Sequence, residues 1–238
     1  MNEAREVILA NIRRSLRRGR LDSATEAELR ARAGAHRRNV MPVRAMALDD
    51  SARIDLFVTM AEEAQATITR VGAADAVPGA VSDYLAQENL PAECVMAPDP
   101  SLDAIPWATR PLLKIRRTGT PAADAATLTP AFAAIAETGT LLLISGPDTP
   151  TTLNFLGDTH VVILRADQIV ATYEDGWDRL RAVRPSPKDL PRAVNFITGP
   201  SRTGDIEQQI VRGMHGPRRL HIILIEPRPP ARNGEASR

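Results

Sequence analysis

Five consecutive residues, Gly199-Pro200-Ser201-Arg202-Thr203, form the segment whose residue types are best suited to binding a ligand. The apolar residues 194–198 before it predict a buried strand, and residues 204–212 after it are predicted to form a helix. In this arrangement, free backbone N–H groups and the positive end of the helix dipole would point out of the edge of the sheet. We therefore predict that the loop binds a small anionic ligand at the carboxyl end of its strand, where open α/β sheets bind ligands.

The side chains of this loop suit an anionic group. Ser201 and Thr203 have hydroxyl groups that can donate hydrogen bonds, and the guanidinium of Arg202 is a planar fork suited to a carboxylate or a phosphate. A structural interpretation is also open, in which Thr203 caps the helix, Asp205 complements its dipole and Arg202 pairs with a carboxylate of the protein. The segment has neither a Walker loop ending nor the Gly-x-Gly-x-x-Gly pattern of a dinucleotide site, so nucleotide binding gains little support.

A second polar cluster comes just before an apolar strand predicted at residues 140–144. Glu137 supplies a carboxylate that could act as a base or a nucleophile, and Thr138 and Thr140 supply hydroxyl groups on either side of Gly139. We treat Glu137 as the candidate catalytic residue and Thr138, Gly139 and Thr140 as candidate ligand-binding residues. The alternative is structural: Glu137 would hold backbone N–H groups of the turn, and Gly139 would supply a positive φ angle.

The four histidines show no spacing typical of a metal site, and no zinc site is predicted. His215 lies in a turn before the last predicted strand, where its imidazole could meet Arg202 if neighbouring strand ends converge, so it is a further candidate ligand-binding residue. His160 and His221 begin or lie within apolar strands, and we interpret both as core histidines with satisfied hydrogen bonds. His36 lies in the basic N-terminal region.

Residues 148–157 form a polar loop, rich in hydroxyl groups, between two predicted core strands. The loop could close over a ligand. An ordinary long connection explains it equally well.

Short apolar runs alternate with helical stretches over most of the chain, which is typical of an α/β protein. Continuous apolar strands indicate a sheet that is covered on both faces, so we predict a three-layer sandwich with a mostly parallel central sheet and right-handed crossovers. The predicted strands are residues 94–96, 112–115, 140–144, 160–164, 194–198 and 220–225. The predicted helices are residues 3–18, 25–38, 51–70, 78–85, 175–183 and 204–212.

The chain divides into three predicted parts. Residues 1–48 form an N-terminal helical extension and linker, with the linker at residues 39–48; residues 49–227 form the α/β domain; residues 228–238 form a disordered tail. The extension carries many arginines but lacks the aromatic side chains that stack on nucleic-acid bases, so we expect no nucleic-acid partner.

The composition sets limits on the chemistry. The 238 residues are 43% hydrophobic, enough for a substantial core, and the formal net charge is +1. Cys94 is the only cysteine, so this chain alone cannot hold an iron–sulfur cluster through several thiolates. No apolar stretch approaches the roughly 18 residues of a membrane span, and no secretory signal is recognisable. We therefore expect a cytoplasmic protein without a cofactor of its own.

Three blocks of sequence together resemble the LUD-domain family of lactate-utilisation proteins. The blocks are residues 135–141, residues 150–156 with 159–161, and residues 199–207 with 215–221. The resemblance covers residues 55–226, and the ordered occurrence of the three blocks is more specific than any one of them. It implies a fold like the sugar-phosphate isomerase and CoA-transferase group. In the related CoA-transferases a Glu near a Gly-containing turn is the nucleophile, and Glu137 is similarly placed.

The resemblance also implies a role in oxidising L-lactate to pyruvate beside other subunits, one of which carries iron–sulfur clusters. The chain would then be a non-redox accessory or ligand-binding subunit without demonstrable activity alone. Two alternatives stay open. The chain could be an independent enzyme that acts on a phosphorylated sugar or an acyl-CoA through Glu137, or a structural adaptor that docks through its N-terminal helix.

Overall fold

The computed structural model describes residues 2–17, 19, 21–38, 42–117, 125–206 and 209–226. They fall into two compact units, Met1–Met41 and Pro42–Arg238. The first unit contains the helices α1 (Asn2–Ser15) and α2 (Ser23–Gly34), which confirms the two helices predicted there. Helix α2 begins after Asp22, whose carboxylate accepts a hydrogen bond from the backbone N–H of Thr25 at 2.9 Å. The predicted disordered tail lies outside the described residues.

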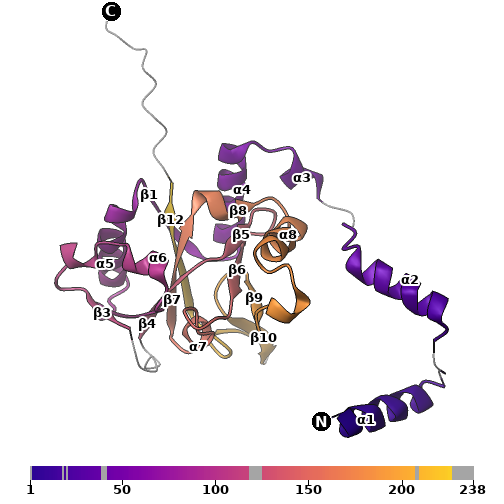
Figure 1. Ribbon diagram of the computed structural model, residues 1–238. Coiled ribbons are helices and arrows are strands. Elements are labelled where there is room, and N and C mark those ends of the chain that lie inside the picture. The colour runs from indigo at the N-terminus through magenta and orange to yellow at the C-terminus, as the bar shows by residue number, and fades with distance from the viewer. Residues whose placement is uncertain are drawn as a thin grey trace, which may run out of the picture. The chain divides into compact units, whose positions relative to one another are not determined.

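A six-stranded parallel sheet forms the centre of the second unit (Figure 1). Every neighbouring pair in it runs parallel. Such a sheet must be covered on both faces, and its two central strands β7 and β12 are accordingly rich in buried aliphatic residues. Its strands, in spatial order, are β1 (Thr67–Val71), β12 (Arg219–Ile225), β7 (Thr159–Arg165), β4 (Ala126–Pro130), β2 (Glu93–Met96) and β3 (Lys114–Arg116).

A smaller, four-stranded sheet lies beside the central one and is mostly antiparallel. Its strands, in spatial order, are β8 (Ile169–Val170), β5 (Ala133–Ile135), β6 (Thr140–Ile144) and β9 (Val194–Ile197). The apolar runs of β6 and β9 were predicted as strands, which is confirmed. Their residues do not indicate that they belong to a second sheet. A continuous apolar run indicates burial on both faces and carries no information on strand direction.

The helices cover the two faces of the central sheet. Figure 1 shows α5 on one side of it and α4, with the smaller sheet, on the other. The α-helices of the second unit are α3 (Val43–Met46), α4 (Asp50–Glu63), α5 (Val77–Gln87), α6 (Pro100–Asp103), α7 (Thr152–Phe155) and α8 (Tyr173–Val183). The 3₁₀ turns are η1 (Ala74–Ala76), η2 (Trp107–Thr109), η3 (Ala166–Gln168) and η4 (Pro187–Asp189). The predicted α/β sandwich with a mostly parallel central sheet is therefore confirmed.

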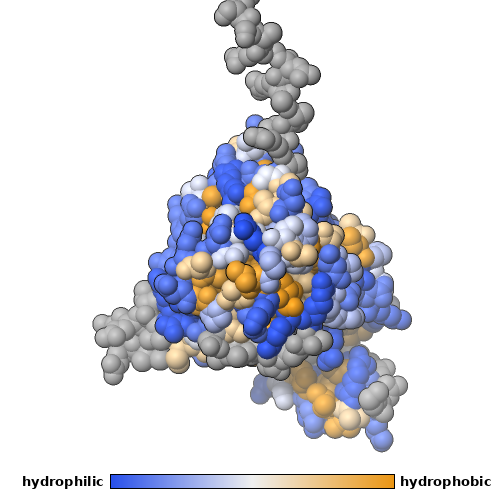
Figure 2. Space-filling model, turned by 90° about the vertical axis from the view of Figure 1, so that its left-hand side faces the viewer, coloured by the Kyte–Doolittle hydropathy of each residue, from blue (hydrophilic) through white to orange (hydrophobic). Residues whose placement is uncertain are grey.

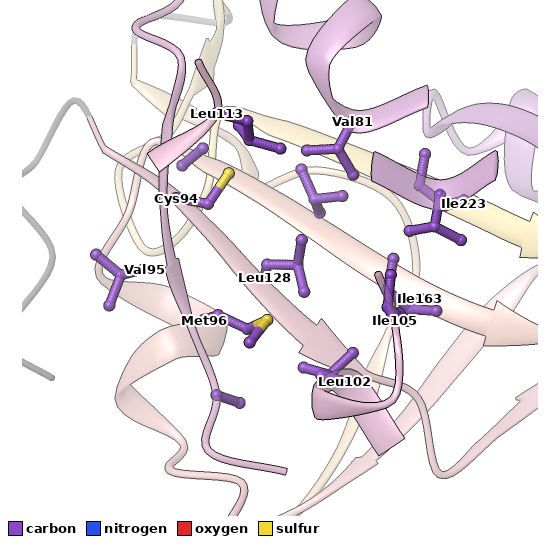
Figure 3. Packing of buried hydrophobic residues seen from close by; sticks show 14 of the residues in the cluster. Val81, Cys94, Val95, Met96, Leu102, Ile105, Leu113, Leu128, Ile163 and Ile223 are labelled. Atoms are coloured by element: carbon purple, nitrogen blue, oxygen red, sulfur yellow. The ribbon is translucent and has the colours of Figure 1, made fainter. Parts of the chain in front are cut away.

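Each face of the central sheet has its own hydrophobic core. On the α5 side, Val81 of the helix packs with Cys94, Met96 and Leu128 of the sheet, as Figure 3 shows. These side chains are fully buried, and burying a side chain of this size stabilises the fold by roughly 1.5–3 kcal/mol. Cys94 is therefore a core residue, and its burial raises the pKa of its thiol to about 12.

The second core fills the space between the central sheet, α4 and the smaller sheet. Phe57 and Ala61 of α4 pack in this core with Leu141 of β6, and Val162 and Ile222 contribute to it from the central sheet. Helix α4 is thus held by both sheets. Its position decides where the loops at its C-terminal end can lie.

Helix α4 ends earlier than the sequence predicted. The predicted helix 51–70 stops at Glu63, and Thr67–Val71 forms the edge strand β1. The chain leaves the helix through Gln65, which has φ 69°, while the backbone N–H of Ala66 donates to Ala61 O at 3.0 Å. This turn satisfies the last carbonyl groups of the helix, and the β-branched residues that follow favour a strand. The predicted linker 39–48 likewise contains a short helix, α3.

The predicted helix 204–212 is also wrong. Arg202–Ile206 and Gln209–Arg212 are the strands β10 and β11, which pair antiparallel with Arg202 opposite Arg212 and Thr203 opposite Val211. The β-branched residues of the segment favour strands. The Gly199–Thr203 loop therefore leads into a hairpin, and no helix begins there.

Figure 2 shows the face of the second unit that carries α5, α6 and β3, where apolar side chains gather among polar ones. Leu112, just before β3, is 86% exposed. Strand β3 has three residues and ends the sheet on this side, and a short edge strand offers little backbone for pairing with another chain. Among the described residues, no helix is long and apolar enough to cross a membrane.

A substitution at Gly139 would test how closely α4 packs against the smaller sheet. This glycine has φ 63°, and a Cβ atom at this position would lie 2.2 Å from the backbone nitrogen of Ala61. We expect Gly139→Ala to lower the free energy of unfolding by at least about 2 kcal/mol, because both the φ angle and the helix backbone must adjust. Urea denaturation measures the change. Gly72→Ala is the matched control because nothing lies within 4 Å of its Cβ position, and equal losses in both variants would contradict the close packing.

Candidate functional site

A cavity of about 250 Å³ lies where the Gly199–Thr203 loop meets helix α7 and the turn at residues 213–217. Its floor is formed by the first residues of β7 and β12, where His160 pairs in register with Leu220. The lining residues are Asn154, Phe155, His160, Phe196, Ile197, Thr198, Gly199, Pro200, Ser201, His215, Gly216, Pro217 and Leu220. Segments far apart in the sequence thus form one site.

The cavity lies at the amino ends of the central strands. Residues 198–201 follow the carboxyl end of β9, as predicted, but β9 belongs to the smaller sheet and runs antiparallel to β6. The prediction of a site at the carboxyl ends of a parallel sheet therefore does not describe this cavity.

Gly199 lets the loop cross the C-terminal end of α4. It has φ 69°, and a Cβ atom there would lie 2.0 Å from the carbonyl oxygen of Ala64. Only glycine fits such an approach without strain. Ser201 is then fixed by two backbone hydrogen bonds, because its N–H donates to Pro217 O at 2.9 Å and its carbonyl accepts from Gly213 N at 3.0 Å.

Arg202 and Thr203 lie in the first residues of β10, and neither lines the cavity. The guanidinium of Arg202 is exposed and donates to the carbonyl oxygen of Ala64 at 3.4 Å. A cation beside the last carbonyl groups of a helix is a favourable C-terminal contact. With no helix beginning at residue 204, the proposed anion site at a helix N-terminus loses its physical basis, and neither Thr203 nor Asp205 caps a helix.

His215 reaches the loop through its backbone. Its N–H donates to the hydroxyl oxygen of Ser201 at 3.3 Å, and its exposed side chain lies at the rim of the cavity. The predicted meeting of His215 with Arg202 is replaced by this contact with Ser201. Of the predicted ligand-binding residues, the cavity thus brings together Gly199, Pro200, Ser201 and His215.

Glu137 is buried in the turn between β5 and β6 and does not line the cavity. Its carboxylate accepts a hydrogen bond from the backbone N–H of Tyr173, the first residue of α8, at 3.1 Å. Its backbone carbonyl accepts a hydrogen bond from Arg44 of α3. The carboxylate thus lies at the positive end of the α8 dipole. As in the structural interpretation it accepts a backbone N–H, but that group belongs to α8 and not to the turn of Glu137.

Four hydroxyl groups connect this turn to the rim of the cavity. The hydroxyl of Thr140 lies 2.7 Å from that of Thr138, 3.0 Å from that of Tyr173 and 2.6 Å from that of Thr198. Thr138 also donates to the Tyr173 hydroxyl at 3.1 Å. Thr198 lines the cavity, so the two polar clusters that the sequence singled out separately are parts of one hydrogen-bonded structure.

The family assignment follows from the comparisons with known proteins. The LUD domain model matches residues 54–225. Lactate utilization protein C of Deinococcus radiodurans is 35% identical over 167 residues, which cover 67% of this chain and 73% of that protein. The chain belongs to the LUD-domain family.

Other relatives match over shorter stretches. Lactate utilization protein C of Bacillus subtilis is 34% identical over 94 residues, and that of Anoxybacillus flavithermus is 36% identical over 94 residues. These matches cover 40% of this chain and about two fifths of each relative. Among solved structures, a DUF162 family protein of Deinococcus radiodurans superposes with a TM-score of 0.54 at 27% identity, covering 75% of this chain and 99% of that one.

Three polar residues that line the cavity of this LUD domain, Asn154, His160 and Thr198, were not predicted as ligand-binding residues. Asn154 of α7 is buried. The sequence placed it in the polar loop 148–157, which could close over a ligand or be an ordinary connection. His160 is completely buried, with its Nε2 atom 2.7 Å from the Thr129 hydroxyl, but its Nδ1 atom has no partner among the described residues. The sequence showed an apolar strand around His160 and could not show which strand or loop would face its ring.

His221 is the second buried histidine of the LUD domain and lies outside the cavity. Its Nδ1 atom lies 2.8 Å from the Thr67 hydroxyl, and its ring stacks on Tyr84 at 3.7 Å between centroids. Its Nε2 atom has no partner in the described part of the chain. The predicted burial of both histidines is confirmed, but each is satisfied at one ring nitrogen only.

No group of three or more His, Cys, Asp or Glu side chains in the described ranges is arranged to hold a metal ion.

The two histidines make stability depend on pH. Burial lowers the pKa of His160 to about 3 and that of His221 to about 4, from an ordinary value of 6.5. The unfolded chain therefore takes up protons below pH 6.5 that the folded chain refuses, so the free energy of unfolding falls as the pH drops from 6.5 towards 4. We expect a slope of about 1.4 kcal/mol per pH unit for each histidine. Urea denaturation between pH 7.5 and 4.5 measures it.

His221→Gln serves as the internal comparison for this slope. It removes one of the two groups, so the slope between pH 6.5 and 5 should drop to about half. A variant with the full wild-type slope would contradict the assignment.

Thr140 is the centre of the hydroxyl network. Thr140→Val keeps the shape of the side chain but leaves the hydroxyls of Thr138, Tyr173 and Thr198 without their shared partner. We expect a loss of about 1–3 kcal/mol in the free energy of unfolding, since a buried polar group left unsatisfied costs that much. Thermal and urea denaturation measure it. Thr59→Val, which removes an exposed hydroxyl on α4, is the control and should change stability by less than about 1 kcal/mol.

Proposed function

We propose that this chain is a non-redox, ligand-binding subunit of a system that oxidises L-lactate to pyruvate. The observation that carries the proposal is the 35% identity, over two thirds of the chain, to a protein named lactate utilization protein C. The shorter matches to further proteins of that name support it. The cavity, lined by residues of the second and third of the three sequence blocks, supports a binding role for the subunit.

The electrons of the reaction would be received by a partner. Oxidation of lactate to pyruvate removes two electrons and two protons, which requires a redox group. A cluster of iron and sulfur is normally held by several thiolates, and this chain has one cysteine, Cys94, whose thiol is buried in the core. We therefore place the iron–sulfur clusters in another subunit and the handling of a small ligand in this one.

The cavity changes which residues we assign to ligand binding. Thr198, Ser201 and His215 offer polar groups at its rim, and Asn154 and His160 offer them deeper inside. Arg202 and Thr203 lie outside it and are assigned to the structure of the loop and hairpin.

The competing proposal, an independent enzyme that uses Glu137 as a base or nucleophile, has weaker support. The Glu137 carboxylate accepts the Tyr173 N–H and has no place among the lining residues of the 250 Å³ cavity. A nucleophile must be reached by its substrate, and a base must lie within hydrogen-bonding distance of the proton that it removes.

One growth experiment separates the two proposals. A strain that lacks this gene and any paralogue is expected to lose growth on L-lactate and to keep growth on glucose. The wild-type gene should restore growth on lactate, and so should Glu137→Gln, because glutamine keeps an oxygen that accepts the Tyr173 N–H. Purification of the tagged chain from these cells should bring down an iron–sulfur protein with lactate-dependent dye reduction.

Unchanged growth of the deletion strain on lactate would contradict the proposed role in lactate oxidation. Restoration by the wild-type gene but not by Glu137→Gln, with equal amounts of folded protein in the cells, would favour the enzyme reading instead. Structural damage is separated from lost chemistry by comparing the denaturation midpoints of the two proteins.

A further inference from the structure

His160, one of the residues that line the cavity, has a buried ring nitrogen without a hydrogen-bond partner among the described residues. The Thr129 hydroxyl and His160 Nε2 are 2.7 Å apart, and neither group has another partner in the described ranges. If the hydroxyl donates to Nε2, the neutral ring carries its proton on Nδ1, and that single N–H is left unsatisfied. The other tautomer leaves two groups unsatisfied, the Thr129 hydroxyl hydrogen and the Nδ1 lone pair. The first arrangement costs less, so Nδ1 is a hydrogen-bond donor that lacks an acceptor.

A buried donor without an acceptor costs about as much as a lost hydrogen bond, and native proteins seldom retain one without a reason. Complete burial keeps the ring uncharged at neutral pH, since it lowers the pKa of His160 to about 3. The missing partner is therefore an oxygen atom that accepts one hydrogen bond from a neutral imidazole.

The lining of the cavity indicates that this oxygen belongs to an uncharged molecule. The described residues that line it include no Arg, Lys, Asp or Glu, and His215 is the one titratable side chain at the rim. A carboxylate or phosphate inside would lose its hydration without gaining an opposite charge, which is strongly unfavourable. Arg202, the nearest cation in the loop, points its guanidinium towards Ala64 at the end of α4.

The apolar part of the lining favours a flat ring. Phe155 and Phe196 line the cavity together with Pro200, Pro217 and Leu220. Aromatic and proline side chains present flat apolar surfaces, and a planar ring stacks on them at a small entropic cost. A volume of about 250 Å³ is sufficient for one small ring system.

We propose that the cavity binds an uncharged planar carbonyl compound of the quinone class, with one carbonyl oxygen accepting a hydrogen bond from His160 Nδ1. The His160 ring is completely buried in this structure, so the carbonyl reaches Nδ1 only if lining side chains move aside, and we infer that Phe155, 38% exposed on the four-residue helix α7, is one of them. Asn154 of the same helix supplies an amide beside the entering group.

The choice of a quinone within this class rests on the proposed function. L-Lactate becomes pyruvate by losing two electrons and two protons, and a quinone becomes a quinol by gaining two of each. A subunit that holds the quinone beside an iron–sulfur partner would present the electron acceptor, while the partner carries the electrons. Binding of an uncharged carbonyl ring to the cavity does not itself depend on lactate chemistry.

The protein contains a reporter for this binding. Trp177 of α8 lies 5.4 Å from the ring of Phe196, between centroids, and Phe196 lines the cavity. The other tryptophan, Trp107, packs against the opposite core, so Trp107→Phe leaves a single reporting indole. The probe is 2,3-dimethyl-1,4-naphthoquinone, whose ring carries no free position that could react with a thiol.

The experiment titrates the full chain with this probe and follows quenching of Trp177, with calorimetry as a second readout. We expect saturable binding that millimolar L-lactate, pyruvate or phosphate does not displace. His160→Gln keeps an amide near the Thr129 hydroxyl but has no donor at the Nδ1 position, and it should weaken binding about five- to tenfold, the value of one hydrogen bond. His221→Gln is the matched control, a buried histidine outside the cavity, and should bind as tightly as the wild type.

A second variant tests the same cavity in case His160→Gln fails to fold. A Cβ atom on Gly216 would lie 3.5 Å from Ser201 Cβ and 3.6 Å from Phe155 Cδ1, which are ordinary contacts. Gly216→Leu therefore places its side chain at the cavity without forcing the backbone to move, and it should abolish binding while the denaturation midpoint stays near that of the wild type.

Equal affinities of His160→Gln, His221→Gln and wild type would overturn the role of Nδ1. Unchanged binding by Gly216→Leu would overturn the location, and displacement by lactate, pyruvate or phosphate would overturn the uncharged class. These results are independent of the growth test. A chain that is needed for growth on lactate but binds no quinone refutes this inference alone, whereas a quinone-binding chain that is dispensable for such growth refutes the proposed function alone.

Discussion

Two glycines pressed against the C-terminal end of α4 are the constraint on which the candidate site depends. Gly139 approaches the backbone of Ala61, and Gly199 approaches the carbonyl of Ala64, each with a positive φ angle. Both contacts are too close for any side chain. Because α4 is itself held between the two sheets by Phe57 and Ala61, its end acts as a fixed point against which two separate loops are positioned.

The hydroxyl network follows from this arrangement. The turn that contains Gly139 carries Thr138 and Thr140, and the strand that leads into Gly199 ends with Thr198. Placing both loops at the end of one helix brings these hydroxyls within 2.6–2.7 Å of one another. The network joins the turn of Glu137 to the cavity-lining residues through Thr198, while the Glu137 carboxylate accepts the first N–H of α8.

The two buried histidines show how similar sequence contexts lead to different roles. Both lie in apolar strands of the central sheet, and both keep one ring nitrogen without a partner among the described residues. His221 faces α5 and stacks on Tyr84 in a closed core. His160 faces the opposite side, where the loop after β9 and helix α7 leave a cavity in place of packed side chains. The loops that pack against a strand, more than the strand itself, decide whether a core histidine lies beside a cavity.

The sequence by itself determined the alternation of apolar strands with helices, the covered central sheet, and the residues of the polar clusters, because hydrophobic periodicity and residue type act over a few neighbouring positions. It placed Ser201, His215 and Thr140 in the right neighbourhood. It failed for residues 204–212, where a predicted helix is a hairpin of β-branched residues, and for residues 67–70, where a turn after Glu63 ends the helix.

Only the tertiary structure decided that there are two sheets, that the loops meet at the amino ends of the central strands, and that Arg202 turns to the end of α4. Strand direction, sheet membership and the packing of loops on α4 arise from contacts between residues far apart in the chain. Such contacts leave no periodic signal in the local sequence, and His160 therefore read as an ordinary core residue until its neighbours were known.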